Sequence, residues 1–243
     1  MEQPTVCAVM LTKDRPEMSN RAYWCFESQT EAQRLLILDT GEKQFFPDHC
    51  REVISRTRAV YAPELRDRSI GWLRNYANQL AVEYCKPDVL MHLDSDDWSG
   101  PHRITEQVAL LQSSGKDCVG YKDMLFWREA DQQAWLYTNS DPRYCLGTSL
   151  CYWRRTWERN PFKDRNIAED REFLREIDSL GVSIFGAPIS LPPAVCPPEH
   201  DGYEPRMIAS IHGKNTSSCV VPDSPNWMRA TLRDSYCRER MKL

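Results

Sequence analysis

The stretch VLMHLDSDDWSGPHRI, residues 89–104, places a cluster of acids directly after a strand-like run. Its first five residues are mostly apolar, which is typical of a strand covered on both faces. Three carboxylates follow within four positions, at Asp94, Asp96 and Asp97. Because like charges at such short spacing repel one another, the cluster needs a physical reason.

The residues around this stretch alternate between strand and helix patterns. The strand patterns lie at residues 6–11, 34–39 and 53–61, and the helix patterns at 16–26, 70–84 and 101–115. Asp14 and Glu17 are placed to form a capping box at the first helix, and Ser69 to cap the second. Alternation of this kind favours parallel strands joined by right-handed crossovers. The first half of the chain therefore reads as an α/β unit.

The second half is less regular. Strand patterns occur at 118–127, 134–137 and 207–211, a helix is expected from Glu169 to Leu180, and a proline-rich stretch at 188–205 is expected to be an irregular ordered loop. The segment 150–157, LCYWRRTW, is aromatic and basic. It fits a single-stranded nucleic-acid surface, but core tryptophans with arginines at the rim are favoured.

The totals describe a globular protein: 243 residues, 41% hydrophobic and 27% charged, with a formal net charge of −4. This charge gives no support for a broad nucleic-acid surface, although a local basic groove stays open. No membrane span and no signal peptide are evident, so a cytoplasmic location is expected. The ten cysteines form no C-x-x-C pair, and we expect thiols.

The acid cluster has two physical explanations. Side chains at the carboxyl end of a strand in an open α/β sheet face the crevice where ligands bind. A hard cation such as Mg²⁺ or Mn²⁺ would neutralise Asp94, Asp96 and Asp97 there, together with a substrate diphosphate. Alternatively, the acids and Ser99 precede the helix expected at Pro101, whose dipole favours negative charge. Spacing alone leaves both explanations open.

These segments together resemble the GT-A glycosyltransferases, in particular the family 2-like enzymes of compact bacterial or phage type. The resemblance spans roughly residues 5–217. It rests on MLTKDRPE (10–17), LILDTG (36–41), IGWLRNYAN (70–78), LDSDDW (93–98), YCLGTSLCYWRRTWERNPF (144–162), IAEDREFL (167–174) and RMIASIHGKNTS (206–217).

The resemblance implies one α/β, Rossmann-like domain with a mixed central sheet at residues 1–213. Its nucleotide-binding half would be 1–115 and its acceptor and catalytic half 116–213, followed by a tail or arm at 214–243. It also implies a cytoplasmic enzyme of a bacterial or phage-infected cell.

The resemblance assigns a set of residues to the donor nucleotide and its sugar. They are Asp39 at the base, Thr12 and Arg15 along the base and ribose pocket, Arg74 at the nucleotide, and Asp94 and Ser95 near the ribose or donor sugar. The predicted order of strands and helices agrees with this assignment. Asp39 ends the second strand, and Arg74 lies one turn into a helix that faces the same sheet edge.

The metal ligands implied by the resemblance are Asp96, Asp94 and His212. Carboxylate oxygens suit Mg²⁺ and Mn²⁺, and imidazole suits Mn²⁺ moderately well. Asp97 is either a further ligand or a helix cap. For His212, an ordinary polar residue with a partner is an equal alternative. His92, inside the strand, is expected to be a hydrogen-bonded core residue.

Glu169 and Asp170 begin the last predicted helix, and the resemblance makes Asp170 the general base. An acceptor hydroxyl is a poor nucleophile until its proton is removed, and a placed base contributes about 10²–10⁴-fold. From residues alone, the two acids would more simply cap a surface helix.

The expected activity is metal-dependent transfer of a sugar from a nucleotide-diphosphate donor, with a UDP-sugar favoured, to an acceptor hydroxyl with inversion. This is a hexosyltransferase reaction. The alternatives are a non-catalytic sugar-nucleotide-binding protein and a glycosyltransferase that acts on modified DNA bases. A nucleotidyltransferase is disfavoured because LTKDRPEM (11–18) has no glycine for a phosphate loop. The acceptor could be a polysaccharide, lipid, protein, small molecule or modified DNA.

Overall fold

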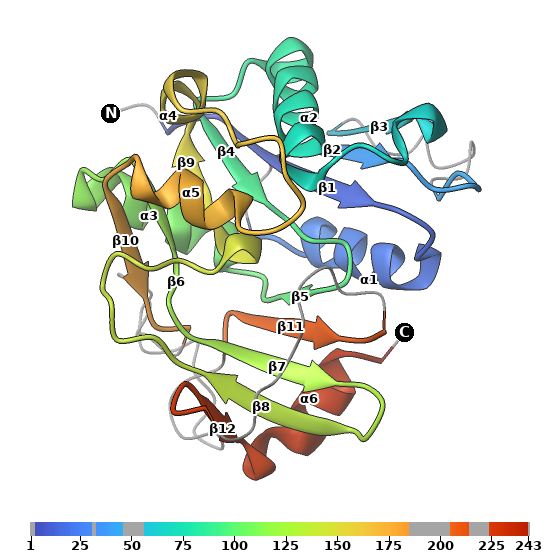
Figure 1. Ribbon diagram of the computed structural model, residues 1–243, viewed down its shortest axis with the longest axis vertical. Helices are drawn as coiled ribbons and strands as arrows, with labels where there is room; N and C mark the ends of the chain where they lie inside the picture. The colour runs from blue at the N-terminus through green and yellow to red at the C-terminus, as the bar shows by residue number, and fades with distance from the viewer. Residues whose placement is uncertain (1–2, 31–32, 46–55, 185–204, 214–223, 243) are drawn as a thin grey trace.

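The computed structural model describes residues 3–30, 33–45, 56–184, 205–213 and 224–242. Within these ranges the chain forms a seven-stranded sheet and a five-stranded sheet (Figure 1). No helix in the described ranges is long and apolar enough to cross a membrane. The cysteines in these ranges are free thiols, as expected.

The first sheet is mixed, in the order β10-β6-β9-β4-β1-β2-β3. Its strands are β1 (Val6–Thr12), β2 (Arg34–Asp39), β3 (Thr57–Tyr61), β4 (Val89–His92), β6 (Cys118–Tyr121), β9 (Cys151–Trp153) and β10 (Ser179–Val182). All neighbours are parallel except β9, which runs antiparallel to both β4 and β6. This arrangement is the mixed central sheet that the sequence predicts.

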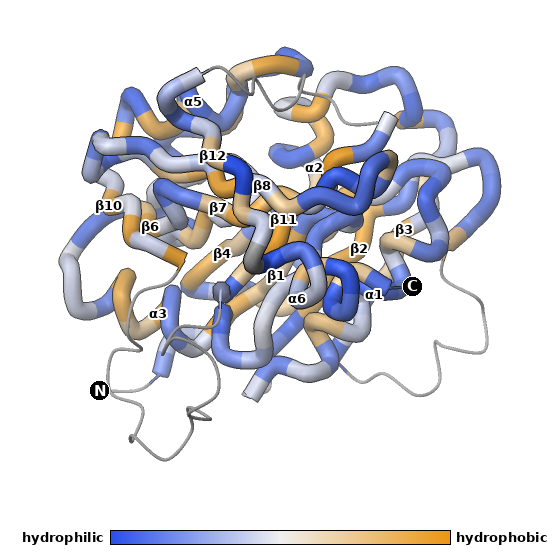
Figure 2. The backbone as a smooth tube through the Cα atoms, turned by 90° about the horizontal axis from the view of Figure 1, so that it is seen from below, coloured by the Kyte–Doolittle hydropathy of each residue, from blue (hydrophilic) through white to orange (hydrophobic). Residues whose placement is uncertain are grey.

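Helices cover both faces of this sheet because side chains alternate along each strand. On one face, α1 (Pro16–Glu27) and α3 (Arg103–Ser114) pack on the even-numbered side chains of β1. On the other face, α2 (Ile70–Cys85) packs on β1, and α5 (Glu169–Arg175) lies against α2 in the same core cluster as Cys7 and Val9. Figure 2 shows hydrophobic stretches along β1, β2 and β4 and hydrophilic stretches at the periphery. The core therefore lies on both faces of the strands that end at the acid cluster.

The second sheet has the order β12-β8-β7-β11-β5 and lies below the first in Figure 1. Its strands are β5 (Trp98–Ser99), β7 (Met124–Arg128), β8 (Gln133–Tyr137), β11 (Met207–Ile211) and β12 (Trp227–Arg229). β5 directly follows the acid cluster and pairs with β11. The loop of carboxylates is thus the connection between the two sheets.

The C-terminal segment packs against this second sheet, although the sequence suggests a tail or arm. Residues 231–233 form the short helix η5 and α6 (Asp234–Arg240) follows. Tyr236, Cys237 and Met241 are buried with residues of β7 and β11. The described part of the segment is therefore folded, whereas residues 214–223 and most of the proline-rich stretch lie outside the described residues. The domain boundaries stay a prediction.

The capping box predicted at α1 is wrong. Arg15 is the N-cap residue and makes no side-chain cap. Asp14 has a left-handed backbone (φ 52°), and its carboxylate instead accepts from the Glu42 amide at 2.7 Å and pairs with Arg66 at 2.8 Å. The loop after β2 competes successfully for this carboxylate. At α2, by contrast, Ser69 accepts from the Trp72 amide as predicted.

The helix predicted over 169–180 is too long. α5 ends at Arg175, and residues 179–182 form β10, which pairs with β6. Ile177 and Leu180 fit a helical period, yet Ile177 is buried beyond the helix and Leu180 lies in the strand. Tertiary pairing at the sheet edge overrides local periodicity here. Similarly, 150–157 divides into β9 and the short helix α4 (Arg154–Arg159).

Candidate active site

The predicted site residues gather at the carboxyl ends of β1, β2 and β4. The register pairs Thr12 with Asp39 across β1 and β2, and β4 runs parallel to β1 on its other side. The acid loop leaves β4 at this edge, so the fold brings the loop, Thr12 and Asp39 to one region.

Asp96 lies at the centre of one cluster. One of its carboxylate oxygens, Oδ2, accepts from Nη1 of Arg15 at 2.6 Å and from Nε2 of His212 at 2.9 Å. Burial raises the pKa of Asp96, but the hydrogen bond from His212 and the charge of Arg15 outweigh burial and hold the pKa below its ordinary value. Asp96 is therefore a carboxylate held between two nitrogen donors. Arg15, predicted to line the base and ribose pocket, contacts the acid cluster.

Asp97 connects the acid loop to the rest of the protein. Its Oδ2 accepts from the Thr148 hydroxyl, and its Oδ1 accepts from the Ser210 amide at 3.0 Å. Burial, followed by the charges of Asp96 and Asp94, raises the pKa of Asp97 well above its usual range. These contacts hold β11 against the loop and use both oxygens. They differ from the helix cap that the sequence allows.

Arg74 joins the acid loop to α5. Its Nε lies 3.3 Å from Oε1 of Glu169, and its Nη1 lies 3.7 Å from Oδ1 of Asp94. Burial raises the pKa of Glu169, and the charge of Arg74 opposes that rise. The buried guanidinium thus links the predicted metal loop with the predicted catalytic helix.

Asp170 lies at the start of α5 and is half-buried. Its Oδ1 accepts from the Arg171 amide at 2.7 Å. The short helix η3 (Gly147–Ser149) approaches its other oxygen, because a Cβ added to Gly147 would lie 2.2 Å from Oδ2. Only a residue without a side chain allows this approach. Gly147 therefore leaves the space that the Asp170 carboxylate occupies.

Asp39 and Thr12 form a separate part of the site. Asp39 is buried, and its oxygens accept from the Gly41 amide at 2.9 Å and the Phe45 amide at 2.6 Å. Burial raises the pKa of Asp39, and these two amides oppose the rise. The hydroxyl of Thr12 lies 2.5 Å from that of Ser19. Asp39 thus orders the loop after β2, and Thr12 joins the end of β1 to α1. Ser95, in the acid loop after β4, is buried.

His92 is a hydrogen-bonded core residue, as the sequence predicts. Its Nδ1 lies 2.7 Å from the Gly147 carbonyl and 3.0 Å from Nη1 of Arg74, and its Nε2 lies 3.3 Å from the Tyr152 hydroxyl. Burial, followed by the charge of Arg74, lowers the pKa of His92 well below its ordinary value. The ring is therefore neutral at neutral pH.

Arg103 is a residue of this region that the sequence reasoning missed. It is 1% exposed, and it donates to the carbonyl oxygens of His92 at 2.7 Å and Thr148 at 3.1 Å. It also donates to Ser99 and Gln107, which lie four residues before and after it. In the sequence, this spacing of four residues was the only indication that Arg103 is hydrogen-bonded within the protein. Its buried positive charge opposes the negative charges of the acid loop.

The aromatic and basic segment has a structural role. The indole N–H of Trp153 donates to the Lys116 carbonyl, and that of Trp157 donates to Asn75. Trp98 packs near Tyr236, with the guanidinium of Arg240 5.7 Å from its ring. These contacts support the interpretation of the tryptophans as packing residues.

The residues present fit a divalent cation only in part. Within the described ranges, no three Asp, Glu, His or Cys side chains are arranged together as a metal site. Asp96 and His212 do supply a carboxylate and an imidazole side by side, a donor set that suits Mn²⁺. Nucleotide enzymes commonly complete such a site with water and substrate phosphates. A two-residue site at Asp96 and His212 is therefore chemically reasonable, with Arg15 on the same oxygen.

No protein-family model matches the sequence, and no curated protein sequence does either. Solved structures do resemble the fold. S. aureus TarS 1–349 in complex with UDP-GlcNAc superposes with a TM-score of 0.63 and 14% identity, over 89% of this chain and 62% of that one. The mannosyltransferase PcManGT from Pyrobaculum calidifontis, in complex with GDP-Man and Mn2+, gives 0.56 and 13%, over 75% and 55%.

The chain therefore has the GT-A glycosyltransferase fold, which confirms the fold predicted from its sequence. It spans less than two thirds of the length of each of these two structures.

Proposed function

We propose that the protein is a glycosyltransferase that moves a sugar from a nucleotide-diphosphate donor to an acceptor hydroxyl. The observation that carries the proposal is the arrangement around Arg74, which joins Asp94 of the acid loop to Glu169, the neighbour of Asp170. The candidate cation-binding loop and the candidate base are thus linked through one buried guanidinium. The complexes of TarS with UDP-GlcNAc and of PcManGT with GDP-Man support a nucleotide-sugar donor, and we favour a UDP-sugar.

The proposed chemistry is a single displacement with inversion. Asp170 accepts the proton of the acceptor hydroxyl while that oxygen attacks the anomeric carbon. The bond between that carbon and the diphosphate oxygen breaks, and its electron pair leaves with the nucleoside diphosphate. Asp39 and Thr12 would contact the base and ribose, and Arg74 would orient the donor. A divalent cation bound at Asp96 and His212 would supply positive charge to the departing diphosphate.

The experiment is the Asp170→Asn variant, assayed for sugar transfer with a panel of nucleotide sugars. Because a placed base contributes about 10²–10⁴-fold, we expect turnover to fall by that factor. Donor binding, followed as the thermal shift caused by the nucleotide sugar, should be unchanged. Turnover close to that of the wild type would remove Asp170 from the mechanism. A wild-type protein that no nucleotide sugar stabilises would remove the proposed function itself.

A further inference from the structure

The helix that carries Asp170 also carries two exposed arginines, Arg171 and Arg175, that form no ion pair among the described residues. α5 and its C-cap residue hold two like-charged pairs at i, i+4 spacing, Arg171 with Arg175 and Glu172 with the C-cap Glu176. Such pairs oppose helix formation, so each needs compensation. The acidic pair has it: Glu172 lies 2.6 Å from Arg165, and Glu176 lies 3.4 Å from Lys163.

The basic pair has no such compensation. Among the described residues, no carboxylate forms an ion pair with Arg171 or Arg175, and both side chains are exposed. Arg143 joins them, because its Nη2 donates to the Ile177 carbonyl just beyond the helix, at 3.1 Å. It too is exposed and forms no ion pair within the described ranges. We call Arg143, Arg171 and Arg175 the arginine patch.

The helix dipole explains only part of this patch. A cation is favoured near the C-terminal end of a helix, where Arg175 lies and where Arg143 contacts the chain. Arg171, however, lies in the first turn, where a cation is disfavoured. The charge at this position is therefore unexplained by the stability of α5.

Aromatic rings without charge continue from the patch across the second sheet. The ring centroid of Tyr144 lies 6.1 Å from that of Tyr137, which lies 5.2 Å from that of Trp227. All three side chains are half-buried. Burial and the neighbouring Tyr137 raise the pKa of Tyr144; the charge of Asp170 adds to this rise and the charge of Arg171 opposes it. Tyr144 lies three residues before Gly147, which approaches the Asp170 carboxylate.

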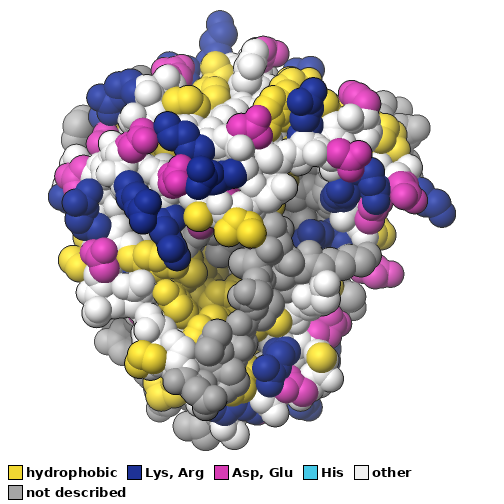
Figure 3. Space-filling view, viewed as in Figure 1, with side chains coloured by type: hydrophobic (Ala, Val, Ile, Leu, Met, Phe, Trp, Pro, Cys, Tyr) yellow, Lys and Arg dark blue, Asp and Glu magenta, His cyan; other side chains and the backbone are white. Residues whose placement is uncertain are grey.

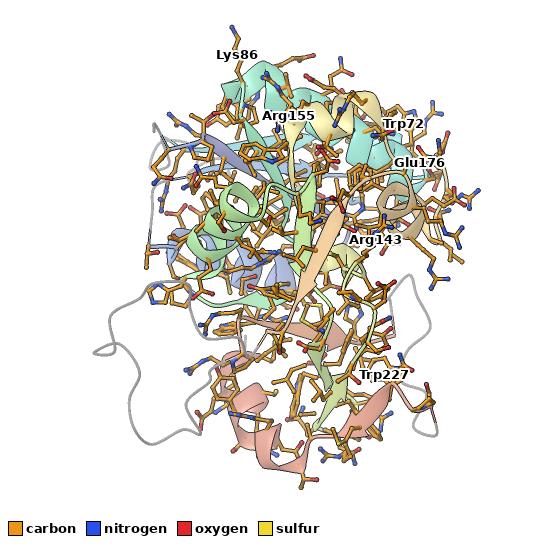
Figure 4. All side chains as sticks on the ribbon, turned by 90° about the vertical axis from the view of Figure 1, so that its left-hand side faces the viewer. Trp72, Lys86, Arg143, Arg155, Glu176 and Trp227 are labelled. Carbon is orange, nitrogen blue, oxygen red and sulfur yellow. The ribbon has the colours of Figure 1, made fainter. Side chains whose placement is uncertain are left out.

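The figures show the side of the molecule on which Arg143 and Trp227 lie. Figure 3 shows Lys and Arg side chains gathered above a hollow with hydrophobic side chains in its wall. In Figure 4, Arg143, Glu176 and Trp227 lie along the same side of the molecule. This surface combines guanidinium groups, aromatic rings and a candidate base. It is suited to a ligand that extends to Asp170.

We propose that the arginine patch and Tyr144 bind the acceptor, and that this acceptor is a saccharide chain carrying phosphate groups. The inference rests on the proposed function, in which Asp170 deprotonates the acceptor. Guanidinium groups match phosphate oxygens in a two-pronged geometry. Uncharged aromatic rings offer an apolar surface with a polar tip to sugar rings.

The size of the patch distinguishes this acceptor from nucleic acid. Three cations suit one or two phosphate groups, whereas proteins that follow a duplex typically neutralise about 6–10 phosphates. The net charge of −4 also opposes the approach of a long polyanion. A short phosphorylated saccharide carries few phosphate groups, and so it matches the three arginines without the repulsion that a long polyanion would meet.

The test measures binding of a fluorescent phosphorylated mannose oligosaccharide to the full chain by anisotropy. In the patch variant, Arg143, Arg171 and Arg175 are each changed to Gln. In the matched control, three exposed cations elsewhere are changed to Gln, namely Arg58, Lys86 and Arg155. We expect at least tenfold weaker binding in the patch variant, wild-type binding in the control, and no binding of the dephosphorylated oligosaccharide.

Equal binding by the patch variant and the control would overturn the inference. So would equally tight binding of single-stranded DNA of the same charge or of a uronic-acid oligosaccharide, and so would failure of the phosphorylated probe to bind. Thermal shifts with nucleotide sugars separate this inference from the proposed function. The patch variant should keep the thermal shifts caused by nucleotide sugars. If the wild type showed no such shifts, the proposed function would be contradicted, but the result of the oligosaccharide-binding test of the patch would still hold.

Discussion

At the scale of single residues, Asp96 shows how the mutual repulsion within the acid cluster is offset. The Asp96 carboxylate accepts hydrogen bonds from Arg15 and His212. The Asp97 side chain accepts from Thr148 and the Ser210 amide, which oppose the rise in its pKa caused by burial and the neighbouring acids. The sequence suggests a bound cation as the reason for the cluster. The structure adds that guanidinium groups from other elements, at Arg15, Arg74 and Arg103, already surround it. Arg15 and Arg74 come from distant parts of the chain, so their contacts with the acids do not follow from any local pattern, whereas Arg103 lies within the same stretch as the acids.

Arg15 and a divalent cation would compete for the same oxygen of Asp96. We therefore expect Arg15→Met to bind Mn²⁺ roughly tenfold more tightly, because a hydrogen bond between charged groups contributes about 1.5 kcal/mol. The free Mn²⁺ signal in electron paramagnetic resonance gives the affinity without any assay of activity.

Arg56→Met is the matched control, since Arg56 pairs with Glu27 away from the acid loop. Asp96→Asn should abolish the binding. Unchanged or weaker Mn²⁺ binding in Arg15→Met would show that the two cations do not compete.

At the scale of elements, the periodic parts of the chain were predictable. β1, β2, β4 and α2 follow from apolar runs and from a Ser69 cap that acts within one turn. The boundary between α5 and β10 was not predictable from the sequence. Ile177 and Leu180 satisfy the helical period, but Ile177 lies beyond the end of α5 and Leu180 lies in β10. Local periodicity predicts that a side chain is buried, but it does not predict which element the side chain packs against.

The approach of η3 to α5 gives a prediction about Gly147. In Gly147→Ala the new Cβ would lie 2.2 Å from the Asp170 carboxylate, so one of the two elements must move. We expect sugar transfer to fall by roughly 10–100-fold, since a displacement of about 1 Å at a catalytic group can cost that much. The measurement is turnover, together with the thermal shift caused by the nucleotide sugar, which should persist.

Gly100→Ala is the control for this substitution. Its Cβ would meet neighbours at 3.4 Å or more, which is ordinary contact, and it lies near the acid loop. Equal activity of the two variants would mean that the position of Asp170 does not depend on η3.

At the scale of the whole molecule, the second sheet and α6 connect the acid loop to the end of the described chain. Arg21 donates to the carbonyl oxygens of Asp96 at 2.5 Å and Met241 at 2.8 Å. β11 supplies the Ser210 amide to Asp97 and leads directly to His212. The geometry of the candidate site therefore depends on β11, which the sequence predicts as a strand, and on α6, which the sequence analysis placed in a tail or arm.

This dependence predicts that Cys237→Asp destabilises the protein by about 3 kcal/mol, because it buries a carboxylate among apolar side chains. Cys237 is fully buried with Tyr236 and Met241 against β7 and β11. Urea unfolding measures the loss, and Arg238→Asp, an exposed change on the same helix, should stay close to the wild type. If α6 were only an arm, both variants would unfold at the same urea concentration. Because Arg21 joins Met241 to Asp96, weakened Mn²⁺ binding in Cys237→Asp alone would show that the packing of α6 supports the acid loop.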